Sequence, residues 1–177
     1  GNCNAFSLEP SPFLFRPTPF NLYRNNGDLT FTDVTVEAGL NILGFWQGLT
    51  YGDYDNDGDI DIFSTSSGTF DPFGVAVTFP HALLQNNGDG TYTDVAAEKG
   101  VADLQYGIGT SFTDFDNNGS LDLFLAGSFP TIGAIGLEGN PGRLFFNDGM
   151  GDFEEDFEAL RIDLSFDYTS GVAQGDY

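Results

Sequence analysis

Short apolar stretches alternate with turn-forming residues along this chain. The run 48–53 alternates in side-chain character before an Asp-rich segment, and the run 60–63 alternates after it. A period of two residues is typical of β-strands with one buried face. The run 22–25 precedes an Asn-Gly dipeptide, which favours a tight hairpin turn. Because little of the chain follows a helical period, we expect an all-β protein.

The same pattern recurs at a fixed interval of 61 residues. The segment 22–28 (LYRNNGD) reappears at 83–89 (LLQNNGD) and, more loosely, at 144–149 (LFFNDG). The Asp-rich loop 53–61 reappears at 114–122. A constant period indicates a repeat architecture. Each unit is predicted to hold four short strands, which is the pattern of a β-propeller blade. The predicted fold is therefore a tandem array of β-propeller-type four-stranded blades.

The repeat period also predicts how the chain is divided. Asp176 begins a third acidic loop, so the array is expected to continue into a further blade. Closed propellers usually have about four to eight blades, and we therefore expect this chain to form part of a larger propeller. The predicted divisions are a Pro/Phe-rich segment at 1–19, the last two strands of a first blade at 20–45, a complete blade at 46–105, a second complete blade at 106–167 and the first strand of a further blade at 168–177.

The two acidic loops carry oxygen-bearing side chains at regular positions. In both 53–61 and 114–122 these side chains occupy positions 1, 3, 5 and 9, and Gly occupies position 6. Ca²⁺ takes about six to eight oxygen ligands in a flexible shell, and alternate residues of a tight loop can point toward one ion. So many carboxylates repel one another unless a cation lies between them. The pattern therefore predicts one calcium site in each loop.

Two other interpretations of these loops are possible. An EF-hand needs a bidentate Glu at position 12 and flanking helices, whereas position 12 is Ser64 in one loop and Leu125 in the other, and the flanks are expected strands. The loops could also be solvated turns rich in Asp and Gly. That alternative does not require the same oxygen positions to recur at a fixed period, and the calcium interpretation explains this recurrence.

The motif at 51–62, together with the Asn-Asn-Gly-Asp and Phe-Thr-Asp-Val elements before it, resembles FG-GAP/VCBS repeats. These repeats are similar to the blades of integrin α-subunit propellers and of secreted bacterial and cartilage acidic proteins. The resemblance implies that each acidic loop joins the first and second strands of a blade and holds Ca²⁺. The ligands it implies are the side chains of Asp53, Asp55, Asp57 and Asp61 with the Asp59 carbonyl in the first loop, and those of Asp114, Asp116, Asn118 and Asp122 with the Ser120 carbonyl in the second.

Charge and composition exclude several classes of partner. The formal net charge is −22, which disfavours nucleic acid and anionic membrane surfaces through repulsion. No apolar stretch approaches the roughly 20 residues that a membrane helix needs. Cys3 is the single cysteine, so an intrachain disulfide is not expected, and the lone His81 is expected to be structural.

These observations predict an extracellular or cell-surface calcium-binding module with a structural, adhesive or protein-interaction role and no enzymatic activity. One alternative is a subunit of an extracellular assembly or filament, because 67–80 and 128–142 are expected to form long apolar loops. These two segments would then contact a protein partner or other copies of the chain. A second alternative is the propeller portion of a carbohydrate-active enzyme, since paired carboxylates also serve glycoside hydrolysis.

Overall fold

The computed structural model describes residues 16–70, 76–102, 107–127, 131–133, 136–138 and 142–156, and every regular element among them is a β-strand. The expected first strand of a further blade, 168–177, lies outside the described residues. No helix in the described part of the chain is long and apolar enough to cross a membrane. The prediction of an all-β protein is confirmed.

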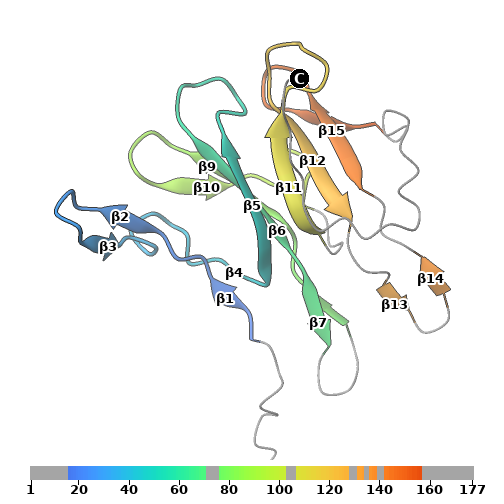
Figure 1. Ribbon diagram of the computed structural model, residues 1–177, viewed down its shortest axis with the longest axis horizontal. Helices are drawn as coiled ribbons and strands as arrows, with labels where there is room; N and C mark the ends of the chain where they lie inside the picture. Colours follow the sequence, from blue (N-terminus) through green and yellow to red (C-terminus); the bar gives the residue numbers. More distant parts are fainter. Residues whose placement is uncertain are drawn as a thin grey trace, which may run out of the picture.

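Two four-stranded antiparallel sheets form the centre of the molecule (Figure 1). In each sheet the four strands pair in the order in which they follow one another along the chain, as they do in a propeller blade. The prediction of propeller-type four-stranded blades is therefore confirmed. The first sheet contains β5 (Trp46–Gly52), β6 (Asp61–Ser66), β9 (Ala82–Asn86) and β10 (Tyr92–Asp94), and the second contains β11 (Gly107–Thr113), β12 (Asp122–Gly127), β15 (Arg143–Asn147) and β16 (Phe153–Glu155).

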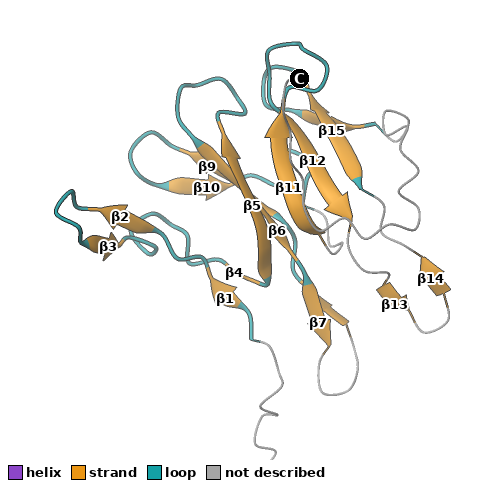
Figure 2. Ribbon diagram, in the orientation of Figure 1, coloured by secondary structure: helices purple, strands orange, loops and turns teal. Residues whose placement is uncertain are grey.

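Four two-stranded sheets accompany the blades. The hairpin of β2 (Tyr23–Asn25) and β3 (Phe31–Asp33) repeats the last two strands of a blade, and β1 (Thr18–Pro19) pairs with β4 (Leu43–Gly44). The segments 67–80 and 128–142 were expected as long loops. They contain hairpins instead, formed by β7 (Gly68–Phe70) with β8 (Ala76–Thr78) and by β13 (Thr131–Gly133) with β14 (Gly136–Glu138). These hairpins extend from the end of each blade opposite the acidic loops (Figure 2).

Apolar side chains fill the space on both faces of the first blade. Phe63 and Leu83 pack with Leu123 and Phe145 in a core between the two blades. Leu84, on the opposite face of the first blade, packs in a second cluster with residues of the N-terminal segment. A strand buried on both faces loses the simple apolar-polar alternation, and this explains why β6 and β9 contain consecutive buried residues.

Two glycines of β5 allow the blades to approach closely. A Cβ atom added at Gly48 would lie 2.4 Å from the Ile108 carbonyl oxygen, and one added at Gly52 would lie 2.5 Å from Leu121 Cδ1. A side chain at Gly48 would force the backbones of β5 and β11 apart, and one at Gly52 would displace the Leu121 side chain. Gly48 thus allows the first strands of the two blades to meet backbone to backbone.

Candidate metal centres

Each acidic loop lies between the first and second strands of a blade. The first loop joins β5 to β6, and the second joins β11 to β12. Asn56 and Asn117 occupy the same position in the two loops and have left-handed φ values of 59° and 60°. Asn tolerates this conformation better than most residues. The two loops therefore adopt the same backbone turn, and the asparagine that recurs at this position allows it.

The first aspartate of each loop organises the turn. The two carboxylate oxygens of Asp53 accept hydrogen bonds from the backbone N–H groups of Asp57 and Gly58, both at 3.0 Å. Asp114 accepts the equivalent pair from Asn118 and Gly119, both also at 3.0 Å. These bonds draw positions 5 and 6 back toward position 1, which gives the loop its closed shape before any ion is considered.

The last aspartate of each loop is fully buried. The Asp61 carboxylate accepts hydrogen bonds from the backbone N–H groups of Tyr54, at 3.2 Å, and Asn86, at 2.8 Å. Asp122 accepts the corresponding bonds from Phe115 and Asn147 at 2.7 and 2.9 Å. Burial is the main cause that raises the pKa of Asp61, to about 6. Burial likewise raises the pKa of Asp122. A cation would reverse this direction, because it favours the ionised carboxylate.

Three carboxylates converge in each loop. Oxygens of Asp53, Asp55 and Asp61 lie within 4.8 Å of one another, as do those of Asp114, Asp116 and Asp122. Each carboxylate oxygen has two lone pairs, so a hydrogen bond to the loop backbone leaves room for an ion. An all-oxygen, carboxylate-rich set of this kind suits a hard cation such as Ca²⁺.

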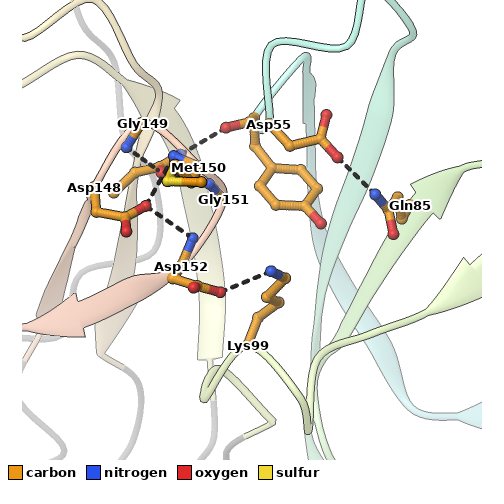
Figure 3. A network of polar contacts seen from close by, with 10 residues as sticks. Asp55, Gln85, Lys99, Asp148, Gly149, Met150, Gly151 and Asp152 are labelled. Atoms are coloured by element: carbon orange, nitrogen blue, oxygen red, sulfur yellow. Dashed lines mark hydrogen bonds and ion pairs between the residues drawn. The ribbon is translucent and has the colours of Figure 1, made fainter.

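The Asp55 carboxylate supplies a further indication that the first loop fits a cation. Its Oδ2 atom accepts a 2.6 Å hydrogen bond from Gln85 Nε2 (Figure 3). Its Oδ1 atom is buried and has no hydrogen-bond partner. A buried polar oxygen without a partner is costly, and a cation held between the three carboxylates would satisfy it.

The remaining predicted ligands lie outside these groups of three. Asp57 Oδ1 accepts a 2.9 Å hydrogen bond from the backbone N–H of Asp59, and Asn118 Oδ1 accepts the equivalent bond from Ser120 at 2.7 Å. These side chains therefore bridge positions 5 and 7 of their loops. The ligand roles assigned to Asp57, Asp59, Asn118 and Ser120 stay predictions, as do those of the three converging aspartates in each loop.

Residues outside the acidic loops, which the repeat pattern did not single out, hold the first loop in place. The Tyr54 ring is fully buried and stacks with Phe112 and Phe153 of the second blade. A Cβ atom at Gly151 would lie 2.9 Å from this ring. Lys99 forms a 2.7 Å ion pair with Asp152 across the same interface (Figure 3). The sequence did contain a signal for part of this support, because the Asn-Xaa-Gly turn recurs at the same interval of 61 residues as the acidic loops.

The fold and the loops define a class of protein: an all-β repeat protein built from propeller-type blades, with an acidic loop between the first two strands of each. Comparison with known proteins gives the family. Residues 13–64 match the model of the FG-GAP-like repeat, so this part of the chain is an FG-GAP-like repeat. The predicted resemblance is confirmed.

Its relatives include cartilage acidic protein 1 of Xenopus tropicalis, which is 34% identical over 107 residues. This match covers 60% of the present chain and 15% of that protein. Cartilage acidic protein 1 of Homo sapiens is 32% identical over 100 residues, which cover 56% of this chain and 14% of the human protein. This chain thus corresponds to a small part of the length of these relatives.

Proposed function

We propose that this chain is an extracellular calcium-binding repeat module in which Ca²⁺ has a structural role. The recurrence of one carboxylate arrangement in both blades carries this proposal. Each loop brings three aspartates together, and each closes through the same hydrogen bonds from its first and last aspartate. Solvated turns would not need to preserve this arrangement in two successive blades.

Electrostatics supports the proposal. Two carboxylates about 5 Å apart repel each other by roughly 1 to 3 kcal/mol, depending on the local dielectric constant. Three of them within 4.8 Å accumulate this cost three times in each loop. A bound dication converts the repulsion into attraction, and it fixes the geometry of a loop that links two strands of one blade.

We assign the ligands by position in each loop. The side chains at positions 1, 3, 5 and 9 and the carbonyl at position 7 would surround the ion. For the first loop this set is Asp53, Asp55, Asp57 and Asp61 with the Asp59 carbonyl, and for the second it is Asp114, Asp116, Asn118 and Asp122 with the Ser120 carbonyl.

The relatives and the charge support an extracellular setting. The matched relatives carry the name cartilage acidic protein 1, which suits an acidic module that acts outside the cell. A net charge of −22 keeps such a module soluble and attracts calcium. A structural, adhesive or protein-interaction role fits this setting. Both groups of three converging acidic side chains among the described residues lie in the acidic loops, which fits a structural role for the ion.

The units of the array and their partners belong to the same proposal. We retain the divisions 20–45, 46–105 and 106–167 as an incomplete and two complete blades of a larger propeller. The hairpins within 67–80 and 128–142 are candidate contacts for a protein partner or another copy of the chain. The described end of the first of them exposes Val77, at 37%.

Calorimetric titration with CaCl₂ tests the proposal. We expect two binding events per chain, with dissociation constants of about 10⁻⁴–10⁻³ M, the usual range of extracellular calcium modules. The double variant Asp53→Asn/Asp114→Asn is the control, because it keeps the size of both side chains and removes one negative charge from each loop. The absence of calcium-dependent heat in the unmodified chain, or equal heat in the double variant, would refute the proposed sites.

A further inference from the structure

Asn147, at the end of β15, is bound to the second acidic loop through three of its polar groups. Its backbone N–H donates to Asp122 Oδ1 at 2.9 Å, and its carbonyl accepts from Asn118 Nδ2 at 3.1 Å. Its side-chain Nδ2 donates to the Leu121 carbonyl at 3.0 Å. The residue is only 1% exposed. Asn147 thus contacts positions 5, 8 and 9 of the loop 114–122.

The same side chain also reaches the first acidic loop, in the neighbouring blade. Asn147 Nδ2 donates a second hydrogen bond, of 2.6 Å, to the carbonyl of Tyr54, which lies 93 residues earlier in the chain. Tyr54 stands between Asp53 and Asp55, two of the three converging carboxylates of that loop. One amide group therefore holds a backbone carbonyl of each loop.

The equivalent residue of the first blade, Asn86, provides an internal comparison. Its backbone N–H donates to Asp61 Oδ1 at 2.8 Å, its Nδ2 donates to the Ile60 carbonyl at 3.2 Å, and its Oδ1 accepts from Gly88 N at 3.1 Å. Asn147 makes the same three bonds within its own blade, with its Oδ1 accepting from Gly149 N at 3.0 Å. It makes two more there, with Asn118 Nδ2 and Gly151 N. Among the described residues, Asn86 has no hydrogen bond to a second acidic loop.

We propose that Asn147 is a positioning residue that couples the two candidate cation sites, so that an ion in one loop raises the affinity of the other. This inference rests on the proposed function. An ion bound in the first loop fixes the backbone around Tyr54, and the Asn147 amide is then held in the orientation that also bonds Leu121. Whichever ion binds first bears the conformational entropy lost when the shared amide is ordered, and the ion that binds second does not. This produces positive cooperativity without a large conformational change.

Coupling of this kind is reciprocal and measurable. Calcium titration of Asp114→Asn gives the association constant of the first site alone, and titration of Asp53→Asn gives that of the second site alone. The product of the two macroscopic association constants of the unmodified chain, divided by the product of these single-site constants, is the coupling factor. We expect a factor of about 5 or more, the lower end of typical allosteric couplings.

Variants of the two equivalent asparagines then separate coupling from loop support. Asn147→Ala and Asn86→Ala each remove the side-chain bonds within their own blade, but only Asn147→Ala removes the bond to Tyr54. We expect the coupling factor to fall to about 1 in Asn147→Ala and to stay unchanged in Asn86→Ala. For each variant, the single-site constants are obtained by adding Asp53→Asn or Asp114→Asn to that same variant. Asn147→Asp, which keeps the side-chain size and lacks the Nδ2 donor, serves with Asn86→Asp if an alanine variant does not fold.

A further variant controls for a general weakening of the contact between the blades. Lys99→Met removes the ion pair with Asp152, which joins the blades outside both loops and leaves the Asn147 amide bonds in place, so it is expected to leave the coupling factor unchanged. A factor of 1 in the unmodified chain that still binds two calcium ions would overturn the coupling and leave the proposed function intact. Coupling that persists in Asn147→Ala would overturn the role of Asn147. Loss of coupling in Lys99→Met would also overturn it, in favour of the whole interface. Absence of any calcium binding would overturn both proposals.

Discussion

Two buried ionisable residues show how burial sets charge in the first blade. Asp61 and His81 are each at most 1% exposed, yet they lie in different surroundings. Asp61 accepts two backbone N–H groups and belongs to a carboxylate cluster, so a cation can stabilise its charged form. His81 Nδ1 instead accepts a 2.9 Å hydrogen bond from the backbone N–H of Ser66. Nδ1 must therefore be unprotonated, which requires a neutral imidazole ring. The structure thus keeps the histidine as a neutral acceptor.

His81 should make the fold less stable in mild acid. Burial, with a smaller contribution from the Arg143 charge, lowers the pKa of His81 from its usual 6.5 to about 4. The folded-state pKa lies below the unfolded value, so the unfolded chain binds the extra proton first. The stability contribution is full above pH 6.5 and is lost as the pH falls toward 4. Between pH 7 and pH 5 the loss should be about 2 kcal/mol.

Urea unfolding at pH 7 and pH 5 measures this loss. The variant His81→Asn is the control, because its Oδ1 can accept the Ser66 N–H and it does not titrate. All other groups contribute equally to both proteins, so the difference between the two pH slopes isolates His81. Equal pH dependence in the two proteins would show that the histidine is not responsible.

At the scale of elements, the blades reuse one loop and one hairpin with small differences in sequence. Three hairpins share an Asn-Xaa-Gly turn, and the residue two positions after its glycine has a positive φ in each: 71° at Leu29, 88° at Gly90 and 80° at Gly151. Glycine adopts this conformation without a steric penalty, and leucine does not. Leu29 is also 96% exposed, so packing does not compensate for the penalty. The first hairpin therefore departs from the repeat at this position.

Replacing Leu29 with glycine should stabilise the protein. Relief of the left-handed strain, less the extra chain entropy that glycine loses on folding, should raise the free energy of unfolding by about 1 kcal/mol. The matched substitution Gly90→Ala places a side chain at an equivalent φ of 88° with no atom within 4 Å of its Cβ, and it should destabilise by a similar amount. Chemical unfolding compares the two variants. A decrease in stability for Leu29→Gly would indicate that the leucine makes a contact that offsets its strain.

The two acidic loops should differ in calcium affinity. Asp57 and Asp59 of the first loop correspond to Asn118 and Ser120 of the second, so the first ion is surrounded by more negative charge. The Asn118 amide also donates to Asp116 Oδ2 at 3.1 Å, which engages one of the three converging carboxylates. We expect the first loop to bind calcium more tightly. In calorimetric titrations, Asp114→Asn should retain the stronger site, and a stronger site in Asp53→Asn would contradict this ranking.

At the scale of the whole molecule, the first loop contributes to the contact between the blades. The Tyr54 ring lies against Phe112 and Phe153, and its carbonyl accepts the Asn147 amide. A disturbance of the first loop therefore reaches the core between the sheets. The corresponding ring of the second loop, Phe115, is 42% exposed. Calcium at the first loop should consequently stabilise more than one blade.

Calcium removal should lower the stability of the whole module. With dissociation constants of about 10⁻⁴–10⁻³ M, millimolar calcium that binds only the folded state adds roughly 1 to 3 kcal/mol over two sites. Thermal melts in millimolar CaCl₂ and in excess EDTA measure this difference. The double variant Asp53→Asn/Asp114→Asn should show a much smaller shift between the two conditions. Identical midpoints for the unmodified chain would mean that the loops do not stabilise the fold through calcium.

Local patterns in the sequence were sufficient for the elements and for the position of the loops. Alternation and Asn-Gly turns determine short strands and hairpins through near-neighbour sterics, and the period of 61 residues placed both acidic loops between equivalent strands. The sequence predicted that the side chains at positions 1, 3, 5 and 9 converge, because a nine-residue loop with glycine at position 6 can bring them together, and the aspartates at positions 1, 3 and 9 do so. In both loops these are the three carboxylates that meet.

Tertiary structure alone decided which residues support the loops from other parts of the chain. The bond between Asn147 and Tyr54 spans 93 residues, and no local pattern encodes it, because it depends on how the blades stack. The hydrogen bonding of the buried Asp61 carboxylate likewise depends on a distant strand, because its Oδ1 accepts from the N–H of Asn86, 25 residues away. The segment 67–80, which is apolar and contains Pro and Gly, was expected as a loop, and part of it pairs as β7 with β8. Contacts between distant elements arise from packing, and only the folded arrangement specifies them.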